Sequence, residues 1–153
     1  MDAYVIVGNA STGKSSLVRA LAGIRNEDRR LMAYATTGTF VLFWAKDSSL
    51  QESRILPSDF ITTVALNRPD AVLCTIWPRG CTSKGVTYPN CAGYLQAFIA
   101  AGWTIKPLVV LDSGSLPTMP SLPSTVTVTH FSNLRTNPFN NFAASIRSHW
   151  NWN

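Results

Sequence analysis

The feature that most constrains this chain is a glycine-containing segment close to its N-terminus. Residues 8–15, Gly-Asn-Ala-Ser-Thr-Gly-Lys-Ser, fit the pattern G-x-x-x-x-G-K-[ST] of a loop that cradles a phosphate. The preceding residues, Tyr4 to Val7, are apolar and mostly β-branched, which predicts a buried strand, and residues 16–22 predict a helix. From average residue frequencies the pattern arises by chance in roughly one of 200 chains of this length. The sequence therefore predicts a phosphate-binding site, the alternative being a glycine-rich turn before a surface helix.

Each part of this segment has a physical role in binding a triphosphate. Backbone N–H groups of the loop and the positive end of the helix dipole converge on the phosphate. Gly8 and Gly13 permit backbone angles and a close approach that a Cβ would obstruct. Lys14 is expected to reach the β- and γ-phosphates and to serve catalysis, and the Ser15 hydroxyl is expected to bind Mg²⁺. The predicted nucleotide-binding residues of the loop are Gly8, Asn9, Ala10, Ser11, Thr12, Gly13, Lys14, Ser15 and Ser16.

Length and composition indicate one globular domain over residues 1–153. Of the 153 residues, 46% are hydrophobic and 14% charged, which is enough apolar surface for a sizeable core. The net charge of +5 suits a polyphosphate ligand, but the basic residues are too dispersed to give a specific nucleic-acid signal. No apolar run is long enough for a membrane span. The three cysteines lack zinc-site spacing, so we expect reduced thiols in a cytoplasmic protein.

Strands and helices alternate along the chain beyond the loop. Residues 24–35 carry most of the local charge and predict an exposed loop, and residues 78–90 predict another. Buried strands are expected at residues 40–45, 70–77, 107–112 and 125–131. Helices are expected at residues 58–67 and 91–101, and after Asn137, with Pro138 at the first helical position. Alternation of this kind predicts an α/β fold, a three-layer α/β/α sandwich with a mostly parallel sheet.

Two aspartates are candidates for the acid that completes a Mg²⁺ site. Such a site needs a carboxylate at the end of a hydrophobic strand, at the sheet edge where the loop lies. Asp112 directly follows the apolar run Pro-Leu-Val-Val-Leu, and Asp47 follows Phe-Trp-Ala after one intervening lysine. Either residue alternatively ends its strand as an ordinary turn residue. The residues alone leave the choice between Asp47 and Asp112 open.

The segment from Gly8 to Gly23 resembles the opening of the small Ras-like and Era-like GTPases, a group of P-loop NTPases. Their next element is a threonine-bearing switch loop, and Ala-Thr-Thr-Gly-Thr at residues 35–39 lies at a similar distance. A D-x-x-G strand end followed by Gln-Glu comes next, and residues 47–52, Asp-Ser-Ser-Leu-Gln-Glu, are similar. The resemblance implies the P-loop NTPase fold, Mg²⁺ bound by Ser15, Thr36 or Thr37, and Asp47, and an attacking water oriented by Gln51.

The chain departs from this family at two positions that bear on function. Leu50 replaces the glycine of D-x-x-G, and Leu-Asp-Ser-Gly-Ser at residues 111–115 stands where the guanine-reading motif N-K-x-D is expected. Asp112 is expected to contact a base or ribose, but the ligand is GTP or ATP without preference. The main expectation is Mg²⁺-dependent nucleoside triphosphate binding with slow hydrolysis, with a possible protein effector. The alternatives are a small-molecule or nucleotide kinase, and a catalytically inert nucleotide-binding interaction module.

Overall fold

Strand β1 (Asp2–Val7) lies at the centre of the fold, because side chains on both of its faces are buried. The computed structural model describes residues 1–24, 27–33, 37–112, 119–132 and 139–152. Tyr4 and Ile6 of β1 belong to one hydrophobic cluster, whereas Ala3, Val5 and Val7 belong to a second. Since successive side chains of a strand point to opposite faces, this division requires a covering layer on each side of the sheet.

The central sheet is mostly parallel and runs in the order β2-β3-β4-β1-β8-β9. Its strands are β2 (Glu27–Ala33), β3 (Phe40–Ser49), β4 (Ala71–Ile76), β8 (Leu108–Leu111) and β9 (Val128–Phe131) beside β1, and the short β7 (Thr104–Ile105) also pairs with β1. Among the described strands of this sheet, only β2 and β3 pair antiparallel. Strand β4 therefore separates β1 from β3.

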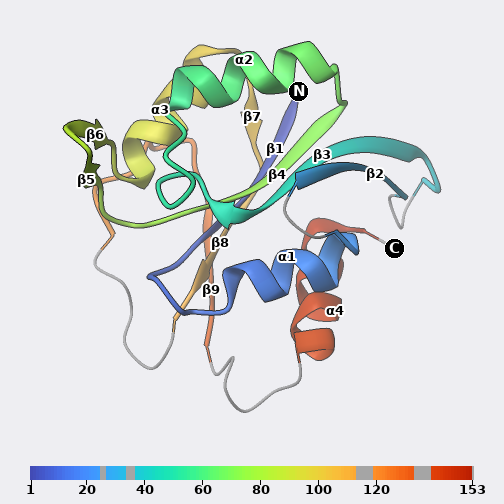
Figure 1. Ribbon diagram of the computed structural model, residues 1–153. Coiled ribbons are helices and arrows are strands. Elements are labelled where there is room, and N and C mark those ends of the chain that lie inside the picture. The colour runs from blue at the N-terminus through green and yellow to red at the C-terminus, as the bar shows by residue number, and fades with distance from the viewer. Residues whose placement is uncertain (25–26, 34–36, 113–118, 133–138, 153) are drawn as a thin grey trace.

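Helices cover both faces of the sheet (Figure 1). Helices α1 (Lys14–Ala22) and α4 (Phe139–Trp150) pack on the face of Tyr4 and Ile6. Helices α2 (Pro57–Asn67) and α3 (Cys91–Ala100) pack on the opposite face. This α/β arrangement with a mostly parallel sheet agrees with the sequence-based fold class and is compatible with a three-layer sandwich.

Most expected elements form close to their predicted bounds, but residues 24–35 were wrongly predicted as an exposed loop. Residues 27–33 of that segment form β2, paired antiparallel with β3. The loop predicted at residues 78–90 contains a small hairpin, β5 (Cys81–Ser83) and β6 (Val86–Tyr88). The predicted cap Asn137 and the following Pro138 lie outside the described residues.

Strand β3 is longer than its predicted range and contains an irregularity. Its pairing with β4 advances from Ala45 opposite Leu73 to Ser49 opposite Thr75. Because four residues of β3 thus face two of β4, the segment between Ala45 and Ser49 bulges, and bulges commonly redirect side chains near functional sites. Asp47 lies in this bulge. In the part of the chain that the structure describes, no helix combines the length and apolarity that crossing a bilayer demands.

Candidate phosphate-binding site

The predicted phosphate loop lies at the carboxyl edge of the sheet, at the point where two neighbouring strands lead to helices on opposite faces. The chain leaves β1 through residues 8–13 into α1 on one face, whereas it leaves the neighbouring β4 through residues 77–90 into α3 on the other. Ligands of open α/β sheets bind in the crevice formed at such a switch point. The loop therefore lies at the position in the fold where a ligand site is expected.

Gly13 of the loop uses the backbone freedom expected of it, and Ser11 has a left-handed backbone that the sequence did not predict. Ser11 and Gly13 have φ angles of 60° and 84°, so the chain is left-handed at two positions before α1 begins. A Cβ on Gly8 would lie 2.6 Å from Thr12 Oγ1, and that hydroxyl donates to the Asn9 carbonyl at 2.9 Å. Any larger residue in place of Gly8 would therefore displace the Thr12 side chain and change the curvature of the loop.

Helix α1 begins without an acid or a side-chain cap in its first turn. Since the first N–H groups of a helix have no partner within the helix, this end of α1 is suited to an anion. The side chains of Ser15 and Ser16 are half-buried there, and Asn9, Ala10 and Ser11 are exposed at the crest of the loop. The structure thus brings the predicted loop residues together around one helix end.

Lys14 is buried within the loop, with 5% of its surface exposed. Its Nζ donates to the Asn9 carbonyl at 2.6 Å, the same oxygen that Thr12 uses. Burial lowers the pKa of Lys14 to about 8, and the nearby Glu52 carboxylate partly offsets this effect by raising the pKa. The ammonium group of Lys14 shares a single uncharged acceptor, the Asn9 carbonyl, with Thr12. A phosphate oxygen at this place would stabilise the charged form by a stronger, charge-assisted hydrogen bond.

A pocket of about 240 Å³ adjoins the loop at the switch point. Asn9 and Ala10 form one wall, and the segment that follows β4, from Trp77 to Cys81, forms the other. The Gly8 N–H donates to the Ile76 carbonyl at 3.3 Å, which fixes the two walls to each other at their base. The pocket is of a size for a phosphoryl group or a small acceptor next to the loop.

A larger pocket, of about 390 Å³, lies at the amino-terminal end of β1. Its lining includes Asp2 and Lys106, whose side chains form an ion pair with an N–O distance of 2.8 Å. This is the edge opposite to the one at which parallel sheets bind ligands, and its charges neutralise each other. Size alone would select this pocket, but chemistry and topology favour the pocket beside the loop.

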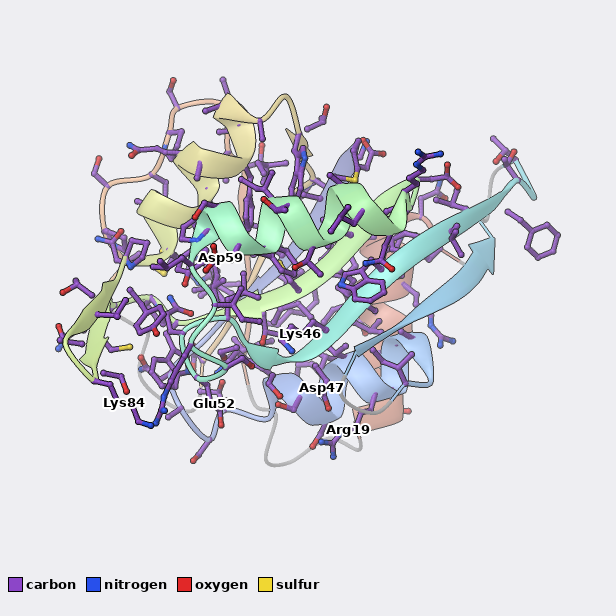
Figure 2. All side chains as sticks on the ribbon, turned by 45° about the horizontal axis from the view of Figure 1, so that its top comes forward. Arg19, Lys46, Asp47, Glu52, Asp59 and Lys84 are labelled. Carbon is purple, nitrogen blue, oxygen red and sulfur yellow. The ribbon has the colours of Figure 1, made fainter. Side chains whose placement is uncertain are left out.

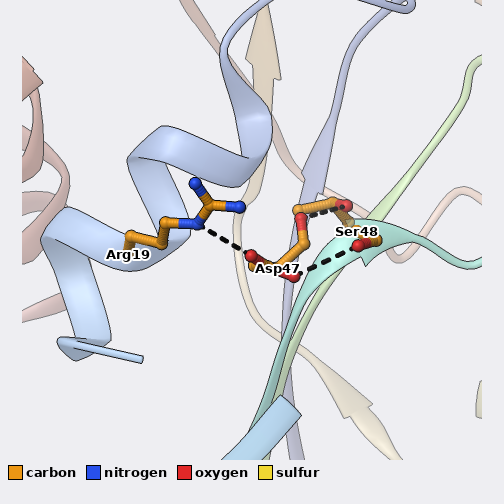
Figure 3. A network of polar contacts seen from close by, with 4 residues as sticks. Arg19, Asp47 and Ser48 are labelled. Carbon is orange, nitrogen blue, oxygen red and sulfur yellow. Dashed lines mark hydrogen bonds and ion pairs between the residues drawn. The ribbon is translucent and has the colours of Figure 1, made fainter. Parts of the chain in front are cut away.

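Asp47, one candidate for the metal-side acid, is engaged with helix α1 (Figure 3). Its side chain is 1% exposed, Oδ2 accepts from Arg19 Nε at 2.9 Å, and Oδ1 accepts from Ser48 Oγ at 3.1 Å. Asp47 also stands two strands away from β1, or about 10 Å. In this conformation it ties β3 to α1, and its role as a Mg²⁺ ligand through water stays a prediction.

Gln51 is buried and joins the turn after β3 to the segment after β4. Its Oε1 accepts from the Trp77 N–H at 3.0 Å, and its Nε2 donates to the carbonyls of Trp77 at 3.2 Å and Pro89 at 3.3 Å. Both ends of the amide are therefore bonded to backbone that borders the pocket. The geometry gives Gln51 a positioning role, and its contact with the attacking water stays a prediction.

Thr37, predicted as a metal ligand, lies at the opposite edge of the sheet from the loop. It is exposed, precedes β3, and accepts a hydrogen bond from the Thr39 N–H at 3.2 Å. Phe43 of β3 lies level with Asp2 of β1, so the start of β3 is nine residues from Gly8 along the strands. At the usual rise this is roughly 30 Å. The structure therefore does not bring Thr37 to Ser15, and Thr36 lies outside the described residues.

Asp112, the other candidate acid, lies at the same edge as the loop. It follows β8, the strand beside β1, and its N–H donates to the Phe131 carbonyl at 3.1 Å. A Cβ on Gly8 would be 3.4 Å from the carbonyl of Leu111, which places the start of the loop against the end of β8. Asp112 and the pocket thus lie on opposite sides of β1, and the contact of Asp112 with a base or ribose stays a prediction.

Glu52 raises the pKa of Lys14, an effect that sequence analysis did not anticipate. It directly follows Gln51 in the segment compared with the GTPases, yet it received no role. The structure gives it an exposed side chain on the turn after β3, close enough to act electrostatically on Lys14. Its position among only eight acidic residues was the available signal.

The residues at this edge fit Mg²⁺ bound together with a triphosphate, rather than a preformed metal cage. Among the described residues, no three or more His, Cys, Asp or Glu side chains gather as a metal site. Mg²⁺ at a nucleotide is held by one or two protein groups, with phosphates and water supplying the other ligands. Ser15 at the start of α1 meets that requirement. Comparison of the chain with protein-family models, curated proteins and solved structures finds no match.

Proposed function

We propose that this protein is a P-loop nucleotide-binding domain that binds a nucleoside triphosphate with Mg²⁺ and hydrolyses it slowly. The observation that carries the proposal is Lys14, buried inside a left-handed loop that opens an uncapped helix. Burial of an ammonium group costs free energy unless an anion compensates it. A polyphosphate would supply that anion, and its oxygens would also accept hydrogen bonds from the N–H groups of the loop.

In this proposal each loop residue acts on a defined part of the ligand. Lys14 neutralises the β- and γ-phosphates, and the loop N–H groups beyond Gly8, up to Ser16, bind their oxygens. Ser15 holds Mg²⁺, which when bound neutralises charge on the phosphate oxygens. Asp112 would contact the ribose or the base, and a single carboxylate is compatible with either GTP or ATP.

Titration calorimetry with ATP, GTP and their diphosphates, with and without Mg²⁺, tests the proposal. We expect binding that strengthens with Mg²⁺, and a loss of roughly 10- to 100-fold in affinity in Lys14→Ala, because a charge-assisted contact is removed. Lys106→Ala at the opposite edge is the matched control and should bind as the unmodified protein does. Equal affinity in the Lys14→Ala variant would refute the proposal.

A second candidate, phosphoryl transfer to a small acceptor, is favoured by the pocket beside the loop. Arg79 lines this pocket and would compensate charge on a transferred phosphoryl group. Nucleotide consumption that requires an acceptor, and that falls in Arg79→Ala, would favour a kinase over a hydrolase. A panel of nucleosides and small metabolites supplies the acceptors.

The inert interaction module is the third candidate, and the same experiments separate it from the others. Leu50 stands where the GTPases have the glycine of D-x-x-G, and its side chain is fully buried. This position therefore lacks the backbone freedom that a switch glycine has. Binding without turnover, under all acceptor conditions, would identify this case and direct attention to a protein effector. All three cysteines are free thiols, which supports our proposal of a cytoplasmic, reducing location.

A further inference from the structure

The pocket at the amino-terminal end of β1, here called the amino-end pocket, has a size and lining of its own. It encloses about 390 Å³, and its walls are Asp2 and Tyr4 of β1, Lys106 and Pro107 before β8, and residues 149–151 at the end of α4. Small-molecule sites in proteins usually measure roughly 300 to 1,000 Å³. The amino-end pocket therefore has room for a small organic ligand, at the end of β1 that lies away from the phosphate loop.

Three parts of the chain are joined to one another around this pocket. The Lys106 N–H donates to the Ala3 carbonyl at 2.9 Å, which attaches the segment before β8 to β1. The Trp150 indole N–H donates to the Pro107 carbonyl at 2.9 Å, which attaches α4 to the same segment. Because these contacts are part of the fold, the walls of the pocket are in place before a ligand binds.

Two aromatic rings form the apolar part of the lining. Tyr4 and Trp150 are 2% and 4% exposed, and their ring centroids lie 5.2 Å apart in an edge-to-face arrangement. The indole N–H of Trp150 is bonded to Pro107, so the ring offers its carbon surface to a ligand. A fixed pair of rings of this kind suits an apolar or aromatic group.

The polar part of the lining is a carboxylate and an ammonium group side by side. Asp2 Oδ2 and Lys106 Nζ lie 2.8 Å apart, and the two side chains are 31% and 33% exposed. An ion pair with this exposure contributes little to stability, so opening it costs little. A ligand that carries both charges would replace this one contact by two charge-assisted contacts. Because Asp2 and Lys106 are adjacent, the two charges of the ligand must be adjacent as well, as they are on the α-carbon of an amino acid.

We propose that the amino-end pocket binds an α-amino acid with an apolar or aromatic side chain. The ammonium group of the ligand pairs with Asp2 and its carboxylate pairs with Lys106. The side chain of the ligand lies against the rings of Tyr4 and Trp150. A ligand with one charge would open the ion pair and compensate only one of its members, so the pocket selects for both charges.

Titration calorimetry of the unmodified protein with L-phenylalanine and L-leucine tests the inference. Phenethylamine and 3-phenylpropionate are the matched probes, since each keeps the ring of L-phenylalanine and lacks one of its charges. We expect at least one amino acid to bind, and each single-charge probe to bind at least about tenfold more weakly than L-phenylalanine, because one charge-assisted contact is lost. This comparison needs no variant.

Two variants assign the contacts to their residues. Asp2→Asn and Lys106→Gln should each weaken amino-acid binding by about tenfold or more, because each removes one of the two charged partners. Lys14→Ala should bind the amino acid as the unmodified protein does, since the inference does not depend on the proposed nucleotide site.

Asp59→Asn on α2 and Lys84→Gln on the β5–β6 hairpin are the matched controls, since each removes the same charge from an exposed side chain elsewhere (Figure 2). Both should bind as the unmodified protein does, and all variants should unfold at about the same denaturant concentration. Absence of binding by both amino acids overturns the inference. Equal binding of L-phenylalanine and a single-charge probe overturns it too, as does unchanged affinity in Asp2→Asn and Lys106→Gln.

Discussion

Lys14 combines burial with a charge that the free protein satisfies only in part. Burial lowers its pKa from the ordinary 10.5 to about 8, so the folded state disfavours the charged form. Between these two values the unfolded chain binds more protons than the folded one, so the free energy of unfolding rises with pH across that window. Below about pH 8 the full penalty is present. Lys14 therefore lowers the stability of the free protein.

The first prediction follows from that cost. Replacing Lys14→Met keeps the length of the side chain and removes the charge, so at neutral pH we expect the free protein to gain about 1–3 kcal/mol in its free energy of unfolding. The same variant should lose nucleotide binding. Urea unfolding and calorimetry measure the two effects, with Lys106→Met as the control. A less stable Lys14→Met variant would contradict the expectation.

The second prediction concerns pH and binding. A phosphate needs the protonated Lys14, and above about pH 8 the free protein loses that proton. Because binding then has to restore the proton, we expect the dissociation constant to rise with pH above this value, by up to about tenfold per pH unit. Calorimetry across the range from neutral to mildly alkaline pH measures this. An affinity that stays constant over the range would refute it.

At the scale of elements, the ion pair between Arg19 and Asp47 joins α1 to β3. Asp47 is 1% exposed and Arg19 is half exposed, so water screens the guanidinium but not the carboxylate. We expect Arg19→Met to lower the free energy of unfolding by about 1–3 kcal/mol, because it leaves a buried carboxylate with one weaker partner. Adding Asp47→Asn in the same chain should recover part of the loss.

The pair between Lys106 and Asp2 provides the comparison for this third prediction. Both side chains are about one-third exposed, and such pairs contribute between 0 and about 1 kcal/mol. Lys106→Met should therefore cost less than Arg19→Met in the same urea series. Equal costs would mean that the Arg19–Asp47 contact does not act as a link between the two elements.

The elements with strong apolar patterns were predictable from sequence, and β2 shows where this fails. The apolar run Ala-Val-Leu-Cys-Thr-Ile predicts a central strand, and in the structure these residues form β4, which is buried on both faces. The charged segment Glu-Asp-Arg-Arg at the start of β2 indicates a loop. The whole of β2 nevertheless pairs with β3 over seven residues. An edge strand tolerates charge, and its pairing depends on a partner more than ten residues away. The local sequence pattern of β2 does not indicate which strand it pairs with.

At the scale of the whole molecule, one part of the candidate site was predictable from the sequence and another part was not. The predicted phosphate loop is one continuous segment, so its residues are identified from the sequence, and Gly13 has a left-handed backbone. The Trp77–Cys81 wall comes from the segment after β4, and it meets the loop because β4 lies beside β1. Strand order is a property of the assembled sheet. Thr37 lies apart from the loop for this reason, since β3 begins at the opposite edge of the sheet.

The last prediction concerns Trp152, which closes the layer of α1 and α4 over the sheet. Its ring centroid lies 4.6 Å from that of Tyr4 and 4.8 Å from that of Phe43, so residues from three distant parts of the chain share one cluster. Trp152 is 4% exposed, and its indole N–H is buried with no hydrogen-bond partner among the described residues. Its contribution is therefore apolar packing.

We expect Trp152→Ala to lower the free energy of unfolding by about 3–5 kcal/mol, the usual cost of removing a large buried aromatic ring. Trp152→Phe should cost clearly less, because it keeps ring contacts with Tyr4 and Phe43 and removes the unsatisfied N–H. Urea unfolding measures both. Nucleotide affinity should survive in Trp152→Phe, since the cluster supports α1 from the side away from the loop. A Trp152→Ala variant as stable as the unmodified protein would show that this ring does not hold the layer to the sheet.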